Sequence, residues 1–190
     1  GISIMSELRT NRIVPRDGLP SGSSGGIIQV KQTVLDTVFT SNSTSYTDVT
    51  GMSVIITPQR SDSKILVMVN LRCSMNQSDR WSSYILLRDS QILFDGTADG
   101  SRTQSSLWHI NFEGTGNGNS IGDKNITFLD SPASTSALTY KLQMKVQSGA
   151  TGYVNRTGND ADADYATRTS SSITVMAVSY THLRAHETSD

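Results

Sequence analysis

Three acidic side chains alternate along residues 159–165, where the sequence reads NDADADY. Asp160, Asp162 and Asp164 match the first, third and fifth positions of an EF-type calcium loop. That loop also needs Gly at position six and a bidentate Glu at position twelve, where this chain has Tyr165 and Ser171. The EF-type motif therefore fails. A looser oxygen-ligand site stays open, but we favour a solvated acidic loop and expect neither a metal ion nor a cofactor.

Two further patterns invite a catalytic or metal-binding interpretation. The run GNSIG at 118–122 fits the G-x-S-x-G pattern of a nucleophile elbow, which needs a strand before it, a helix after it and a downstream His. It lies instead in a Gly/Asn-rich stretch, and the only downstream histidines are His182 and His186 in the C-terminal tail. His109 has no second ligand at zinc spacing, so we expect a half-exposed strand residue there. We therefore expect no catalytic residues and no enzyme.

Four large aromatic residues lie in or beside turn-rich segments: Trp81, Trp108, Tyr153 and Tyr165. Exposed aromatic rings with Asn, Asp and Arg nearby are suited to contacts with sugars or proteins. The same residue types also fill the cores of β-sandwiches. Both interpretations stay open, and these four residues join Asp160, Asp162 and Asp164 as candidate ligand contacts.

Composition excludes several classes of function. The chain has 190 residues, a net charge of −1 and no basic stripe, so we expect no nucleic-acid partner. No apolar stretch approaches the roughly 20 residues that span a bilayer, so we expect no membrane insertion. No secretory signal is visible, which indicates that a protein acting outside a cell would leave it by another route. The single Cys73 cannot form an intrachain disulfide.

Period-two alternation predicts an all-β fold. In KILVMVNLRCSM (64–75), one face would carry Ile65, Val67, Val69, Leu71, Cys73 and Met75; in LTYKLQMKVQSG (138–149), one face would carry Tyr140, Leu142, Met144 and Val146. Further strands are expected at 27–39, 45–48, 52–57, 107–112 and 125–129, near the C-terminus at SSITVMAV, and on both sides of a turn at 88–91. No stretch inside 27–178 carries a helical stripe. Many short strands favour an antiparallel sandwich or barrel.

The organisation along the chain predicts three parts. Residues 1–26 form an attachment segment and a Pro/Gly/Ser linker, residues 27–178 form the sandwich, and residues 179–190 form a disordered tail. The tail resembles translated read-through of adapter DNA, and a plain polar tail is the alternative. Residues 1–4 precede MSELRTNRI, which would be a natural start, so they are either upstream read-through or part of the protein.

Two resemblances extend this interpretation. The N-terminal run MSELRTNRIVPRDG followed by GGIIQVKQT resembles the start of bacteriophage tail-fibre and other virion structural proteins, with Leu8, Asn11 and Ile13 in the matching segment. The body is similar in pattern to C1q/TNF-like jelly rolls, through SKILVMVNLRCSM, YILLRDSQIL, ALTYKLQMKVQSG and SSITVMAV. Together they imply an antiparallel jelly-roll sandwich with an extended N-terminal tether, assembled as a homotrimer.

A surplus of apolar residues is compatible with a trimer and with a second arrangement. Leu66 and Met68 lie opposite Ile65 and Val67, so the strand is apolar on both faces near its start. A sandwich needs only one apolar face per sheet. A neighbouring subunit about a threefold axis would cover the surplus, and so would the N-terminal strand 27–39.

We therefore expect a non-enzymatic phage virion protein of tail-fibre or head-fibre type. Its N-terminus would join other virion proteins, and its jelly-roll head would bind a host-surface glycan or protein. The first alternative is a cellular carbohydrate-binding or adhesion module of C1q-like fold. The second is a polysaccharide depolymerase, for which Glu113 and the Asp160–Asp164 cluster are the loose candidates.

Overall fold

The computed structural model of the chain describes residues 26–111 and 118–179, which contain eleven strands and no helix. The strands are β1 (Gly26–Leu35), β2 (Phe39–Ser41), β3 (Thr47–Ile56), β4 (Lys64–Met75), β5 (Trp81–Arg88), β6 (Gln91–Ile92), β7 (Leu107–Ile110), β8 (Gly122–Asp130), β9 (Leu138–Val146), β10 (Gly152–Val154) and β11 (Ser171–Ser179). Among these residues there is no helix long and apolar enough to cross a membrane.

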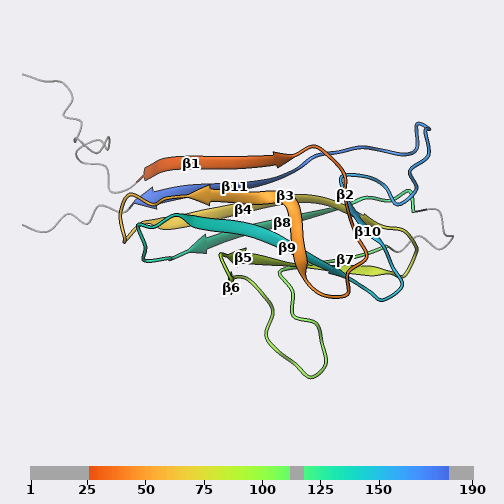
Figure 1. Cartoon of the computed structure of the whole chain (residues 1–190), viewed down its shortest axis with the longest axis horizontal. Coiled ribbons are helices and arrows are strands. Elements are labelled where there is room, and N and C mark those ends of the chain that lie inside the picture. The colour runs from red at the N-terminus through yellow and green to blue at the C-terminus, as the bar shows by residue number, and fades with distance from the viewer. Residues whose placement is uncertain (1–25, 112–117, 180–190) are drawn as a thin grey trace, which may run out of the picture.

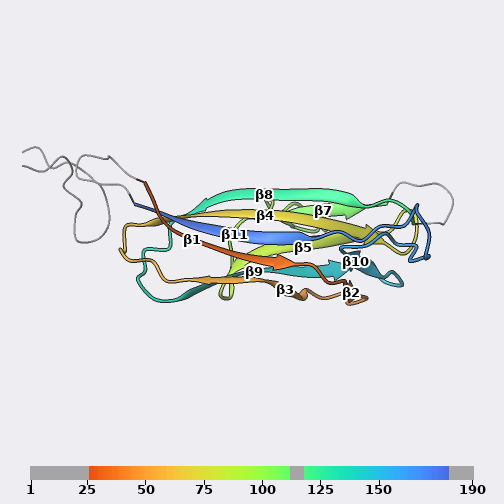
Figure 2. The same cartoon turned by 90° about the horizontal axis from the view of Figure 1, so that it is seen from above.

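The strands form two antiparallel sheets packed face to face as a jelly-roll sandwich (Figures 1 and 2). In sheet A, β1 pairs with β11, β11 with β4, and β4 with β8; the short β10 and β2 continue the sheet beside the end of β4. In sheet B, β3 pairs with β9 and β9 with β5, whose other edge pairs with β7 and β6. The predicted antiparallel jelly-roll sandwich is confirmed, whereas the predicted N-terminal tether lies outside the described residues.

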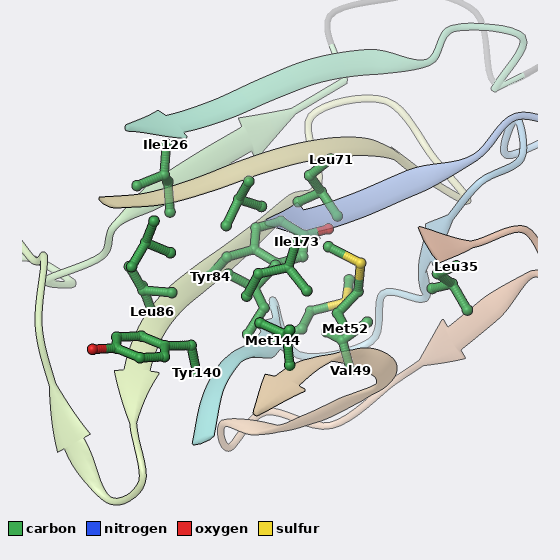
Figure 3. Packing of buried hydrophobic residues seen from close by; sticks show 14 of the residues in the cluster. Leu35, Val49, Met52, Leu71, Tyr84, Leu86, Ile126, Tyr140, Met144 and Ile173 are labelled. Atoms are coloured by element: carbon green, nitrogen blue, oxygen red, sulfur yellow. The ribbon is translucent and has the colours of Figure 1, made fainter. Parts of the chain in front are cut away.

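The core lies between the sheets and follows the predicted alternation (Figure 3). All six residues predicted for one face of β4 are buried, and so are the four predicted for β9. Sheet A adds Ile126 and Ile173, and sheet B adds Met52, Tyr84 and Leu86. Each such side chain contributes about 1.5–3 kcal/mol by leaving water, so this interface supplies most of the stability.

Three elements differ from the sequence-based expectation in more than their end residues. The expected strand 27–39 is divided into β1 and β2. The expected pair 45–48 and 52–57 is one strand, β3, whose register shifts between Asp48 and Ser53. Gly51 at that irregularity has φ +88°, and a Cβ there would lie 2.7 Å from Leu35 Cδ1, so only Gly fits without strain. The three-residue β10 was not predicted, because so short a strand in a polar segment has no periodicity to recognise.

The two ends of the sandwich differ in what they carry. Gly26 pairs with Ser179, so the described chain enters and leaves at one end, on the left of Figure 1. At the opposite end, which we call the distal end, Leu35 pairs with Ser171 and Gly152 with Met75. The connections 76–80, 147–151 and 155–170 also lie at the distal end, because they join strands that end or begin there.

Candidate functional site

The candidate contact residues gather in the distal half of the sandwich, in two groups. Trp81 and Trp108 lie on β5 and β7 of sheet B and form the first group. Tyr153 lies on β10, and the second group consists of Tyr153 and the candidates in the loop 155–170 that follows β10. The attachment residues Leu8, Asn11 and Ile13 lie outside the described residues, as do Glu113, His182 and His186.

Trp81 and Trp108 stack on each other on the outer face of sheet B. Their ring centroids are 4.5 Å apart with an interplanar angle of 23°. Trp108 pairs with Ser83 on the neighbouring strand, which places its ring diagonally beside Trp81. Trp108 is 39% exposed although one of its faces contacts the other indole. The two candidates therefore form one aromatic surface rather than two separate sites.

Tyr46 and Lys145 extend this pair into what we call the aromatic row: Tyr46, Lys145, Trp81 and Trp108. The Lys145 ammonium lies 4.8 Å from the Tyr46 ring centroid and 6.0 Å from that of Trp81. The Tyr46 hydroxyl is 2.6 Å from Ser83 Oγ, and burial raises its pKa above the usual value. Sequence reasoning missed both residues, since only the cross-strand register brings them together.

A pocket of about 400 Å³ adjoins the exposed end of the aromatic row, lined by Arg102, Thr103, Ser105 and Trp108. Its wall belongs to the connection 93–106, which hydrogen bonds hold against the sheet. The Tyr46 hydroxyl donates to the Gln104 carbonyl at 2.9 Å, and the Leu86 amide donates to Ser106 Oγ at 2.9 Å. Arg102 Nη1 donates to Asp99 Oδ2 at 2.8 Å. The pocket therefore combines one indole surface with both donors and acceptors.

The second group, around Asp160, is held together by internal ion pairs. Asp160 pairs with Arg156 at 2.5 Å and with Arg168, and the hydrogen bond from Arg168 lowers the pKa of the carboxyl most. The Arg156 guanidinium carbon lies 3.7 Å from the Tyr153 ring centroid. Tyr153 and Asp160 thus contact the same arginine, while Tyr165 extends into solvent with 56% exposure.

The alternate aspartates do not come together as a cation site. Within the described parts of the chain, no three His, Cys, Asp or Glu side chains gather where they could hold a metal ion. Asp160 lines a pocket of about 270 Å³ with Asp162 and Arg168, whereas Asp164 does not line it. The arginines on Asp160 already supply the positive charge that a cation would bring.

Neither His109 nor the run 118–122 has the surroundings of a catalytic or metal site. His109 is a strand residue, as expected, but it is buried and not half-exposed, because its side chain points between the sheets. Its Nε2 lies 2.9 Å from Asn111 Oδ1, and Asn111 donates to the Met75 carbonyl at 2.9 Å. The run 118–122 ends at Gly122, which is the first residue of strand β8, whereas a nucleophile elbow requires a helix there.

The outer face of sheet A is a third feature, which we call the outer apolar face. Val30, Met176, Leu66 and Leu129 lie in cross-strand register on β1, β11, β4 and β8. Val30 is 53% exposed and Leu129 47% exposed. Further apolar members are Ile27, Val34, Met68 and Val178. One of the two arrangements considered from the sequence had the N-terminal strand covering Leu66 and Met68. The structure contradicts it, because β1 lies in the plane of sheet A and adds apolar residues to this face.

Comparison with known proteins identifies no family for this chain. No family model matches the chain, and no curated protein matches it either. Among solved structures, the chain is similar to one described as the structure of infectious bursal disease virus, Gx strain, with 12% identity and a TM-score of 0.38. The match covers 93% of this chain and 41% of the viral one, so this chain spans less than half of that chain's length.

Proposed function

We propose that this chain is a non-enzymatic virion structural protein of bacteriophage fibre type. It is anchored through its N-terminal segment and displays a jelly-roll head that binds a host surface. The observation that supports this arrangement best is the separation of the two ends of the sandwich. Gly26 and Ser179 pair at one end, whereas Trp81, Tyr153 and Asp160 lie toward the other. A head tethered at Gly26 therefore presents its candidate contact residues away from the tether.

The outer apolar face supports assembly of the head as a homotrimer. A four-strand row of Val, Met, Leu and Leu, flanked by Ile27 and Val178, is more apolar than solvent-facing sheet surfaces usually are. A neighbouring copy about a threefold axis would bury this face in each subunit. Three heads per fibre then bind a surface by avidity, so that each single site can be weak.

Deletion of residues 5–20 tests the attachment role. The proposal expects the shortened chain to fold and to assemble like the full chain, because β1 begins at Gly26, but not to join virus particles. A parallel variant that keeps residues 5–20 and lengthens the Gly/Ser linker 21–25 by five Gly/Ser residues should still be incorporated. Incorporation of the deleted chain would contradict the attachment role.

The genes beside this one separate the virion proposal from a cellular adhesion module. Capsid and tail genes on either side are expected for a fibre protein. A flank of cellular envelope or metabolic genes would favour the cellular alternative.

A further inference from the structure

The aromatic row ends at a pocket whose groups match those of a neutral sugar. We propose that the pocket formed by Trp108, Arg102, Thr103 and Ser105 binds one neutral pyranose unit of a glycan. This inference rests on the proposed host-binding function and names its contact site and ligand class.

Trp108 supplies the apolar part of the recognition. One face of a pyranose ring carries a patch of C–H groups, which packs on an indole and loses water with it. The Trp108 ring is already fixed, because Trp81 stacks on it at 4.5 Å and Lys145 lies 6.0 Å from the Trp81 ring centroid. A ring held in place before binding loses little conformational freedom when a ligand arrives. Part of it stays open to solvent, as its 39% exposure shows.

The polar wall supplies the hydroxyl partners. A sugar hydroxyl both donates and accepts hydrogen bonds, so it needs donors and acceptors side by side. Arg102 provides donors, and its Nη1 is held in place by Asp99 Oδ2 at 2.8 Å. The hydroxyls of Thr103 and Ser105 add groups that do either. The pocket is an open hollow of about 400 Å³, which leaves room for one sugar ring resting on the indole.

Charge balance selects a neutral sugar over an acidic one. The charge of Arg102 is offset by its partner Asp99. The other nearby cation, Lys145, lies over the Tyr46 ring and is not among the residues that line the pocket. A uronic or sialic acid carboxylate would compete with Asp99 for Arg102 and be repelled by it. The affinity should accordingly be almost independent of salt.

The two tryptophans of the chain allow a direct titration, because both belong to the aromatic row. Intrinsic fluorescence of the full chain is followed with galactohexaose, mannohexaose and maltohexaose, and with hexagalacturonate as the acidic match to galactohexaose. At least one neutral probe should give a saturable change with a Kd on the order of 1 mM, unaltered by salt. Hexagalacturonate should give none. A response to the acidic probe only, or to no neutral probe up to about tenfold above that concentration, would overturn the proposal.

Two variants locate the site. Trp108→Ala and Arg102→Met should each weaken neutral-probe binding at least about tenfold. Because the Arg102 side chain is exposed, Arg102→Met should fold normally even if Trp108→Ala does not. Tyr165→Ala, which removes an exposed aromatic from the other group, should bind like the unchanged chain. Unchanged binding by both Trp108→Ala and Arg102→Met would also overturn the proposal.

Host-cell binding separates failure of this site from failure of the proposed function. A full chain that attaches to host cells but responds to none of the neutral probes leaves the attachment function standing and excludes this site. A chain that titrates with a neutral probe, with Trp108→Ala weakened, but attaches to no host cell keeps the site and removes the host-binding role.

Discussion

Arg88 on β5 donates a 2.5 Å hydrogen bond to Asp130 on β8, and so joins sheet B to sheet A inside the sandwich. The Tyr140 hydroxyl donates to the same carboxylate oxygen at 2.7 Å, and the Ser131 amide donates to the other oxygen at 2.8 Å. Three strands from both sheets therefore meet at one charge. The Asp130 side chain is only 8% exposed, so water contributes little to its solvation.

Replacing Arg88 by Met should destabilise the fold by about 3 kcal/mol, because it leaves the buried Asp130 carboxyl without its cationic partner. Urea unfolding at a fixed protein concentration measures the change. The matched control is Arg60→Met, which removes the exposed pair with Asp62 and should cost under about 1 kcal/mol. Equal losses in the two variants would show that the Arg88–Asp130 pair does not stabilise the sandwich.

The buried pair of Arg88 and Asp130 could not be predicted from the sequence, whereas the buried faces of single strands could. Alternation in β4 and β9 depends only on neighbouring residues, so their buried faces could be predicted one strand at a time. Arg88 and Asp130 stand at strand ends beside turns, where charged residues usually face solvent. Their burial follows from the packing of sheet B against sheet A, and no local pattern contains that information.

The candidate site was also predictable only in part. The residue types of Trp81 and Trp108 could be recognised as possible contacts, but their stacking depends on the register between β5 and β7. The role of Asp160 also changed, since Arg168 is eight residues away and Arg156 four residues away on the other side. The first aspartate of the acidic repeat is therefore part of an ion-paired loop with two arginines, which the repeat itself did not indicate.

The outer apolar face makes the proposed trimer testable. The chain mass is 20.6 kDa, so light scattering of the full chain should give about 62 kDa, three times that value. Leu66→Asp places a charge at the centre of the row Val30, Met176, Leu66 and Leu129, and should shift the mass to that of the monomer. Ile55→Asp serves as control, because Ile55 is 59% exposed on the outer face of sheet B. A monomer for the unchanged chain at high concentration would exclude the trimer.

The ion pairs of Asp160 predict an acid-sensitive loop. Its pKa lies below the usual value, first through the hydrogen bond from Arg168. A lowered pKa in the folded state means that the stabilisation is complete above the ordinary Asp pKa and is lost as pH falls through the lowered one. Carbon NMR of the carboxyl during an acid titration should show this. Arg168→Gln should move the pKa back toward the usual value, whereas Arg60→Gln should leave it unchanged; no movement in Arg168→Gln would contradict the pairing.

Cys73 predicts the opposite pH dependence. Burial raises the pKa of this thiol to about 12, so it stays protonated in the folded chain. Because the folded pKa is raised, the related stability is complete below the ordinary thiol pKa of about 8.5 and falls as pH rises from there toward 12. Iodoacetamide should therefore label the native chain far more slowly than the urea-unfolded chain. In a Cys73→Ala background, an exposed thiol introduced by Ser170→Cys should react at the same rate in both states. Fast labelling of native Cys73 would mean that the end of β4 opens readily and that the distal end of the core is not closed.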